Sequence, residues 1–199
     1  MKLTSVIAYG AISIAIYLPG AAIAQASGIY VGGAIGQSDM KQGCDGVPAG
    51  LSCDKKDTGW KAFVGYQLTQ NWGIEGEYVD FGKTTANGTF LGLPTSADVK
   101  VNGWGLVGTG TLPLSPKFDL FGKLGVFRGN VDSHATVGAG SASSSGHSTK
   151  ETFGAGAKWN FSKNWSARLE WERFAKVGDS NTTGTSDVDF ISVGLAYKF

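Results

Sequence analysis

A short motif in this 199-residue chain has glycines at the spacing of a ligand-binding site. Residues 103–108 read GWGLVG and match the dinucleotide-binding pattern G-x-G-x-x-G. That pattern holds a pyrophosphate only where a strand turns into a helix. Here the strand-like alternation continues to Leu112 and ends at Pro113, so the glycines suit a crowded strand. The motif therefore predicts neither a nucleotide site nor a bound cofactor.

His147 and Ser148 could supply the base and the nucleophile of a hydrolytic site. Such a site needs both groups and an orienting acid on rigid elements, whereas these residues lie in a Ser- and Gly-rich stretch that is typical of a loop. His134 is also expected in a loop. Two scattered histidines without clustered carboxylates make a poor metal site. We therefore expect no catalytic or metal centre.

Cys44 and Cys53 share one polar, Gly-rich stretch. In an oxidising compartment the expected outcome is one disulfide that ties this loop, and in a reducing one it is two free thiols. The N-terminus favours the first outcome. Residues 1–26 carry Lys2, an apolar run and small residues around two A-x-A sites, which is typical of a cleaved secretory signal peptide. A transmembrane anchor is the alternative, but the run is short and interrupted by Pro and Gly.

About 173 residues remain after residue 26, which suits a single domain over 27–199. They contain no second long apolar run that would predict a spanning helix. Charged residues make up 17% of the chain, against roughly 25% in an average soluble domain. The net charge of +1 gives no reason to expect a nucleic-acid partner.

The remaining sequence alternates apolar and small or polar residues with period two, which predicts β-strands. Eight such segments lie at 29–36, 60–68, 72–79, 103–112, 118–126, 152–161, 165–172 and 192–199. Long polar connectors near 38–58, 82–98, 130–150 and 178–187 alternate with short turns. We predict a closed, eight-stranded, antiparallel up-and-down β-barrel, in which the third long connector is a mobile loop.

The tryptophans indicate which face of the barrel points outward. All six lie on the apolar face near strand ends, in one group toward the long connectors and one beside the short turns: Trp60, Trp104, Trp171, and Trp72, Trp159, Trp165. Two aromatic girdles are expected where a barrel crosses both interfaces of a membrane. The opposite face carries mainly Gly, Ala, Thr and a few charges, which suits a narrow interior. The pattern therefore favours a transmembrane barrel over a soluble one.

The ordered segments IYVGGAIG, GWKAFVGYQLTQNWGIEGEYVDFG, FDLFGKLGVFRG, GAGAKWNFSKNWSARLEWERF and SVGLAYKF resemble the small eight-stranded outer-membrane barrels of Gram-negative bacteria. That group includes the OmpA transmembrane domain and the opacity-type surface proteins. The resemblance implies both termini in the periplasm. OmpA attaches to the cell wall through a separate peptidoglycan-binding domain, so the resemblance of this segment implies no such attachment.

The resemblance also implies specific site residues. Family barrels hold an interior charge network, and strand parity gives its counterparts here as Lys61, Glu75, Glu77, Lys123, Lys158, Arg168, Glu170 and Glu172. Two positions depart from the OmpA pattern, with Thr109 in place of a Lys and Lys158 in place of a Glu. The C-terminus resembles the signal read by the outer-membrane assembly machinery, carried by Ser192, Gly194, Tyr197 and Phe199.

The functional expectation is a non-enzymatic surface protein that acts in envelope structure, adhesion or antigenicity, with an extracellular or host ligand on its external loops. Its other partners would be outer-membrane lipid and lipopolysaccharide, whose phosphates Arg128 and Arg173 could touch. The alternatives are a narrow pore, although eight strands leave an interior that side chains fill, a lipid A-modifying enzyme and a soluble ligand-binding barrel.

Overall fold

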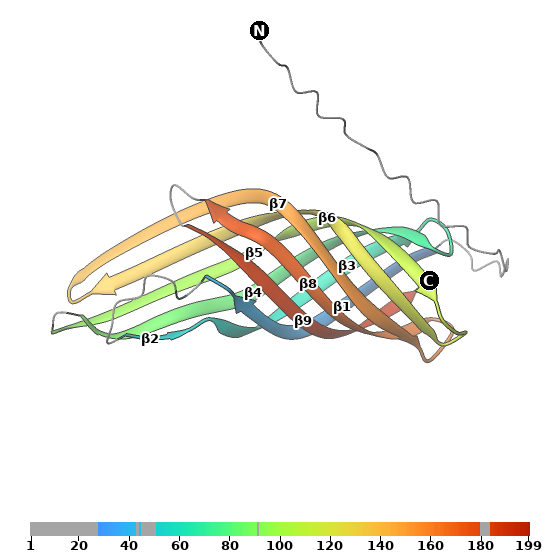
Figure 1. Ribbon diagram of the computed structural model, residues 1–199, viewed down its shortest axis with the longest axis horizontal. Helices are drawn as coiled ribbons and strands as arrows, with labels where there is room; N and C mark the ends of the chain where they lie inside the picture. Colours follow the sequence, from blue (N-terminus) through green and yellow to red (C-terminus); the bar gives the residue numbers. More distant parts are fainter. Residues whose placement is uncertain (1–27, 43, 45–50, 91, 180–183) are drawn as a thin grey trace, which may run out of the picture.

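The structure is a computed structural model that describes residues 28–42, 44, 51–90, 92–179 and 184–199 (Figure 1). The proposed signal peptide lies outside these residues. The described chain folds into strands β1 Gly28–Met40, β2 Leu51–Asp54, β3 Lys56–Gln67, β4 Trp72–Phe90, β5 Leu93–Pro113, β6 Phe118–Val137, β7 Gly140–Asn160, β8 Trp165–Asp179 and β9 Gly184–Lys198. No helix in the described part of the chain is long and apolar enough to cross a membrane.

Eight of these strands close a barrel in which each pairs antiparallel with both neighbours. The ladder runs from β1 through β3 to β9 in chain order, and β9 returns to β1, where Val31 is opposite Tyr197. Within the ring, closure gives every strand a hydrogen-bonded neighbour on both sides, which a lipid-exposed sheet requires. The short strand β2 pairs only with β4, outside the ring. The prediction of a closed, eight-stranded antiparallel barrel is confirmed.

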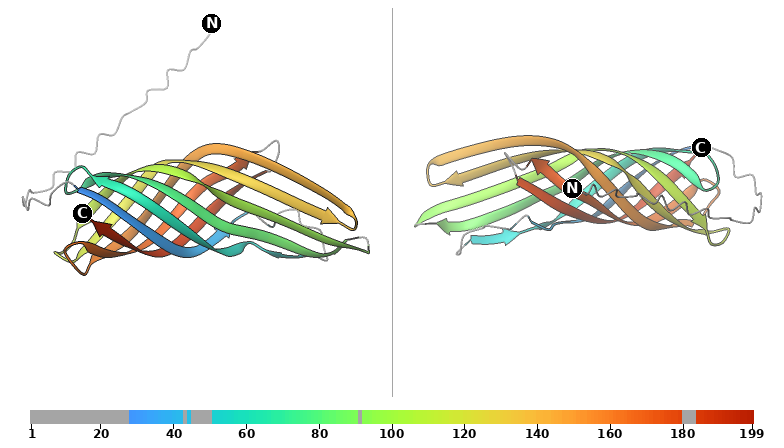
Figure 2. Two further views of the ribbon diagram at one scale, coloured as in Figure 1. Left: turned by 180° about the vertical axis from the view of Figure 1, so that it is seen from behind. Right: turned by 45° about the horizontal axis from the view of Figure 1, so that its top comes forward.

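The barrel has two unlike ends (Figures 1 and 2). The short turns and the C-terminus lie at one end, which we call the short-turn end. At the opposite end, which we call the external end after the orientation expected from the sequence, the hairpins β4–β5 and β6–β7 continue as long ribbons. The β4–β5 ladder runs to the pair Phe90–Leu93, and the β6–β7 ladder to the pair Val137–Gly140.

These ribbons correct two sequence predictions. Residues 82–98 and 130–150 are largely strand rather than irregular connectors, and His134 and His147 lie within β6 and β7. The prediction that the third long connector is an irregular loop was therefore wrong. The Ser-, Gly- and Thr-rich stretch forms β-structure because β6 pairs with β5 on one side and with β7 on the other along it, without any core.

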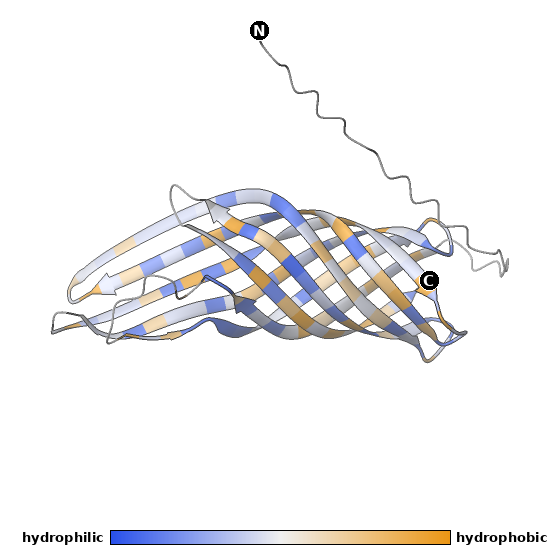
Figure 3. Cartoon of the chain, viewed as in Figure 1, coloured by the Kyte–Doolittle hydropathy of each residue, from blue (hydrophilic) through white to orange (hydrophobic). Residues whose placement is uncertain are grey.

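Apolar and polar residues alternate along the strands, as the colours of Figure 3 show, and the burial of alternate residues separates an outer surface from a packed interior. On the outer face Leu106 and Leu124 are 62% and 69% exposed, in contrast to the fully buried Glu75 and Phe81 on the inner face. Glycine makes room where rings cross the lumen: a Cβ on Gly156 of β7 would collide with the ring of Phe121. An apolar outside and a polar inside are typical of a membrane barrel.

The orientation predicts opposite responses at two positions of β5. Leu106→Arg places a charge on the lipid face and should lower the free energy of unfolding in bilayers by about 2–4 kcal/mol. Thr109→Lys places the same kind of charge on the inner face, which is polar and away from lipid, and should cost far less. Urea titration of both variants in lipid vesicles measures the difference. Equal losses at the two sites would contradict the assigned faces.

Candidate functional site

Seven inward-pointing side chains form one buried charge network of three cations and four carboxylates: Lys61, Lys123, Arg168, Glu75, Glu77, Glu170 and Glu172. Lys123 is its centre, because its ammonium group contacts all four carboxylates. Lys61 pairs with Glu170 at 2.5 Å and with Glu172. Every charge has an opposite partner, which offsets much of the cost of removing it from water.

Arg168 closes the network toward the short-turn end. Its guanidinium pairs with Glu75 at 2.8 Å and with Glu170 at 2.6 Å. The same group lies between two rings, 4.4 Å from the centroid of Phe63 and 4.7 Å from that of Phe121. A planar cation held by carboxylates and stacked on rings has little freedom to move. Arg168 therefore blocks the lumen as well as balancing its charge.

Lys158 does not join the network that the sequence assigned to it. Its ammonium pairs at 3.0 Å with Asp119, a residue of the same inner parity that the predicted network did not include. The register explains the difference, because Lys158 lies opposite Asp119 on β6 and opposite Arg168 on β8. It therefore occupies the next layer toward the short-turn end, where Asp119 is the carboxylate in reach. The interior network has three cations rather than four.

A second plug fills the lumen toward the external end. Ten buried apolar residues form this aromatic plug: Met40, Val79, Phe81, Val101, Phe127, Phe174, Val131, Val177, Val188 and Phe190. Phe81 is fully buried at its centre, with ring centroids of Phe127, Phe174 and Phe190 at 5.7, 4.8 and 5.8 Å in edge-to-face geometry. Such pairs add to the gain from area burial. The sequence analysis expected small residues in the interior and missed this plug.

The aromatic girdle residues lie on the outer face at both ends. Trp60, Tyr78 and Trp104 form a row on β3, β4 and β5, with ring centroids 5.4 and 4.8 Å apart. At the short-turn end Tyr197 contacts both Trp165 and Phe199, each at 5.1 Å. Trp72, Trp159 and Trp171 are also exposed on this surface. Rings placed in this way suit the two interfaces of a bilayer.

Charged side chains follow directly beyond the outer girdle. Arg173 holds Asp189 through two hydrogen bonds of 2.6 and 2.7 Å, and Lys41 approaches the same carboxylate at 3.1 Å. The hydrogen bond from Arg173 keeps the pKa of Asp189 below its usual value. Arg173 is thus engaged within the protein. Lys100 similarly pairs with Asp80 at 3.3 Å. This charged belt suits a headgroup or aqueous environment.

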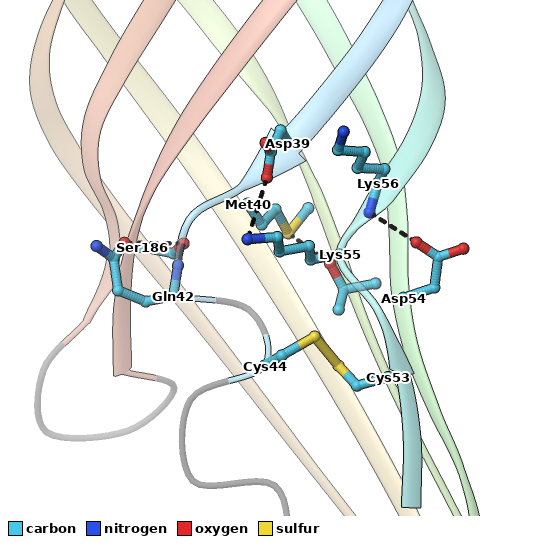
Figure 4. The surroundings of a disulfide bond; sticks show 10 residues. Asp39, Met40, Gln42, Cys44, Cys53, Asp54, Lys55, Lys56 and Ser186 are labelled. Atoms are coloured by element: carbon cyan, nitrogen blue, oxygen red, sulfur yellow. Dashed lines mark hydrogen bonds and ion pairs between the residues drawn. A yellow bond between two sulfur atoms is a disulfide. The ribbon is translucent and has the colours of Figure 1, made fainter.

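The cysteines form a disulfide, Cys44–Cys53, that ties the segment after β1 to β2 (Figure 4). Nearby, Gln42 is joined to Ser186, so this segment is also attached to β9. Because β2 pairs with β4, the disulfide links the end of β1 to β4, across the single strand β3 that lies between them in the ring.

The GWGLVG motif and the pair His147–Ser148 both lie on strands of the described structure. GWGLVG lies within β5, where added Cβ atoms on Gly103 and Gly105 would collide with Phe127 and crowd Glu77. His147 lies opposite Asn130 on the β6–β7 ribbon, and Ser148 Oγ accepts a hydrogen bond from the backbone N–H of Gly178 at 3.2 Å. Among the described residues no group of three or more His, Cys, Asp and Glu side chains could hold a metal ion.

A closed antiparallel barrel with an apolar outer band, two aromatic girdles and a charged interior defines an outer-membrane β-barrel protein. Residues 24–199 match the model of the OmpA-like transmembrane domain, and the chain belongs to that family. Outer membrane protein A of Yersinia pseudotuberculosis is 29% identical over 95% of this chain and 55% of its own length. The Salmonella typhi protein of the same name is 30% identical over 69% and 39%. The chain thus spans about half or less of these relatives.

Solved structures show the same fold. Ail, the attachment invasion locus protein of Yersinia pestis, has 22% identity and a TM-score of 0.54, with 87% of this chain and 97% of Ail covered. The N-terminal β-barrel domain of Pseudomonas aeruginosa OprF has 14% identity and a TM-score of 0.54, with 86% and 98% covered. These two structures show the fold, whereas the family match and the relatives support the outer membrane as the location of the protein.

Proposed function

We propose that this protein is a non-enzymatic surface protein whose barrel anchors an external recognition sheet in the outer membrane. One observation carries the proposal: the lumen is filled at two levels, while the ribbons β4–β5 and β6–β7 extend beyond it. A filled lumen leaves little space for a transport path, and a paired β-ribbon presents side chains at a distance from the membrane. Ail, which is named for attachment and invasion, supports an adhesive role by analogy of fold alone.

The recognition surface we propose includes the β6–β7 ribbon. Pairing between β7 and β8 runs from Asn160–Ser166 to Thr152–Phe174, so residues 140–151 of β7 continue outward beside β6. This stretch consists mainly of Ser and Gly residues, together with His147 and Thr149, and its edge away from β6 is not paired with β8. An exposed strand edge of small polar residues is open to hydrogen bonding by an extracellular or host ligand.

Shortening this ribbon tests the proposal. Replacement of residues 133–144 by Asn-Gly would close β6 and β7 after the pair Asp132–Ser145 with a two-residue turn, and the barrel would stay intact. Cells with the full-length protein should adhere to host cells or immobilised matrix, and cells with the short variant at equal surface level should not. Equal adhesion would reject this ribbon as the recognition surface.

Two further measurements separate the proposal from its alternatives. In planar bilayers the purified barrel should show no stable conductance steps, whereas a narrow pore would. Lipid A from expressing and deleted cells should have the same mass spectrum, because the described residues hold no catalytic constellation. Regular conductance steps or an altered lipid A would each overturn the non-enzymatic anchor.

The orientation and biogenesis are part of the same proposal. Outer-membrane barrels have short periplasmic turns and longer external loops, so we place the short-turn end and both mature termini in the periplasm. Residues 1–26 would be the cleaved signal peptide that directs export, and residues 27–199 the barrel domain. The assembly machinery would read the C-terminal signal, of which Tyr197 and Phe199 form part of the girdle.

Deletion of Phe199 should impair assembly in cells but have little effect on the stability of the folded barrel. The ring is 72% exposed, so its loss should leave refolding in detergent nearly intact. In cells the same deletion should leave the protein unassembled in the periplasm, with a much lower outer-membrane yield. Lys198→Ala, one residue earlier, should affect neither quantity strongly. Normal outer-membrane yield without Phe199 would show that this residue belongs only to the girdle.

A further inference from the structure

The β6–β7 ribbon leaves one long strand edge unpaired in the described structure (Figure 1). The ladder between β7 and β8 ends at Thr152–Phe174, whereas the ladder between β6 and β7 continues to Val137–Gly140. Residues 140–147 are therefore paired on the β6 side only. At about 3.3 Å per residue they present roughly 25 Å of backbone on the other side. We call this unpaired side of residues 140–147 the free edge.

The free edge lacks the features that usually prevent two edges from pairing. Charged side chains, prolines and bulges protect most edge strands. Residues 140–147 contain no Lys, Arg, Asp, Glu or Pro, and the β6–β7 register has no shift, whereas β4–β5 and β8–β9 each contain one. The short strand β2 ends at Asp54 and is followed by Lys55 and Lys56. The free edge is thus far better suited than β2 to accept another strand.

The sequence of the free edge is close to self-complementary. Residues 140–146 read GSASSSG, which is nearly the same in both directions around Ser143. Antiparallel pairing of two copies about this residue would give the opposite pairs Gly140–Gly146, Ser141–Ser145, Ala142–Ser144 and Ser143–Ser143. Every pair is small, no like charges meet, and serine hydroxyl groups that lie opposite each other can form hydrogen bonds. The edge therefore fits a second copy of itself.

The direction of the strands decides where that second copy lies. Barrels that share one membrane and one orientation run their β7 strands in the same direction, so these strands cannot pair antiparallel. Barrels in two facing membranes point toward each other, and their β7 strands run in opposite directions. A two-fold axis through Ser143, perpendicular to the strands, then relates the copies, and the same surface contacts itself. An antiparallel contact therefore joins two membranes.

We propose that the free edge pairs antiparallel with the free edge of a second copy of this chain in a facing outer membrane, and so links neighbouring cells. The inference rests on the proposed external orientation of the ribbon and names one partner for it, the protein itself. One pairing of residues 140–146 is a small contact. Many copies on each surface act together, so the overall attachment is far stronger than a single contact.

Charge variants at Ser143 test the pairing, because this residue would lie opposite itself. Cells of a non-clustering strain that express the protein should cluster and settle from suspension. Ser143→Lys and Ser143→Glu should each lower the settled fraction by about fivefold or more, because like charges then meet across the two-fold axis. A mixture of the two variant strains should cluster again, because opposite charges then meet there.

Ser96→Lys is the matched control. Ser96 lies on β5 and is paired on both sides, with Asn87 and Thr136, so this variant adds the same charge to the same sheet away from the free edge. It should leave clustering unchanged. The inference fails if Ser143→Lys cells cluster like unmodified cells, or if Ser96→Lys disperses them equally. It also fails if the mixed variants stay dispersed, which would show that the edge accepts a strand of another protein.

Adhesion of the same cells to host cells or matrix distinguishes this inference from the proposed function. Cells that adhere but do not cluster would overturn the self-pairing and leave the surface role intact. Cells that cluster without adhering would support the self-pairing and reject a host ligand. Lipid vesicles that carry the purified protein should also cluster, as measured by light scattering, and vesicles with Ser143→Lys should not. Surface labelling and unboiled gel mobility verify equal levels and folding of each variant.

Discussion

Lys123→Met is expected to lower the free energy of unfolding by about 3–5 kcal/mol, the cost of breaking a buried ion pair by removing one partner. The physical reason is charge balance. The network contains three cations and four carboxylates, so it already carries one negative charge in excess. Without Lys123, which contacts all four carboxylates, only Lys61 and Arg168 remain to balance them. Urea titration in lipid vesicles measures the loss.

Glu77→Gln is the matched control, because it changes the same network in the opposite direction. It removes the excess negative charge, and Glu77 Oε1 accepts no hydrogen bond from the described residues. The remaining carboxylates, Glu75, Glu170 and Glu172, keep their cations. We expect a change close to zero. If Glu77→Gln destabilised the barrel as much as Lys123→Met, volume and shape rather than charge would govern this layer.

The two variants also show what parity in the sequence could and could not predict. Alternation places Lys61, Glu75 and Lys123 on the inner face because every second residue of a strand points the same way. Depth along the barrel is set by the register between strands, which a single strand does not reveal. Lys158 has the inner parity, but its register with Asp119 puts it one layer from the network. Parity therefore predicted the face of each charge and not its partner.

The aromatic plug was missed for a related reason. Phe81, Phe127, Phe174 and Phe190 all lie just beyond the predicted strand ends, in segments whose polar composition is typical of loops. The strands continue through these segments because their neighbours continue beside them. Extending the same alternation by a few residues would have placed all four rings inside. Pairing between strands thus extends structure past the point where the hydrophobic pattern fades.

The ribbons are the extreme case of that effect. Residues 140–151 have almost no apolar alternation, and neither membrane nor core fixes their conformation. Their strand structure depends on β6, which pairs with them residue by residue up to Val137 and Gly140. Because this information lies in the partner strand and in the tight turn that joins them, local composition could not reveal it.

Phe81→Ala is expected to lower the free energy of unfolding by about 3–5 kcal/mol, the range for removing a large buried aromatic side chain. The ring is fully buried and contacts three other phenylalanines edge to face. Neither lipid nor bulk water can reach the resulting cavity easily, so little relaxation offsets the loss. Phe153→Ala on the lipid face is the control and should cost clearly less, because acyl chains can fill the vacated space. Equal losses of unfolding free energy for the two variants in vesicle urea titrations would show that Phe81 does not lie in a packed interior.

The same variant tests whether closure of the lumen depends on the aromatic plug. Phe81→Ala removes one ring from the aromatic plug but leaves Lys123 and its four carboxylates in place. The Arg168 guanidinium, stacked between two rings, adds a further barrier. We therefore expect the variant to be less stable yet still non-conducting in planar bilayers. Stable conductance steps after this single substitution would show that the aromatic plug alone keeps the lumen closed, and that the charge network leaves a path for ions.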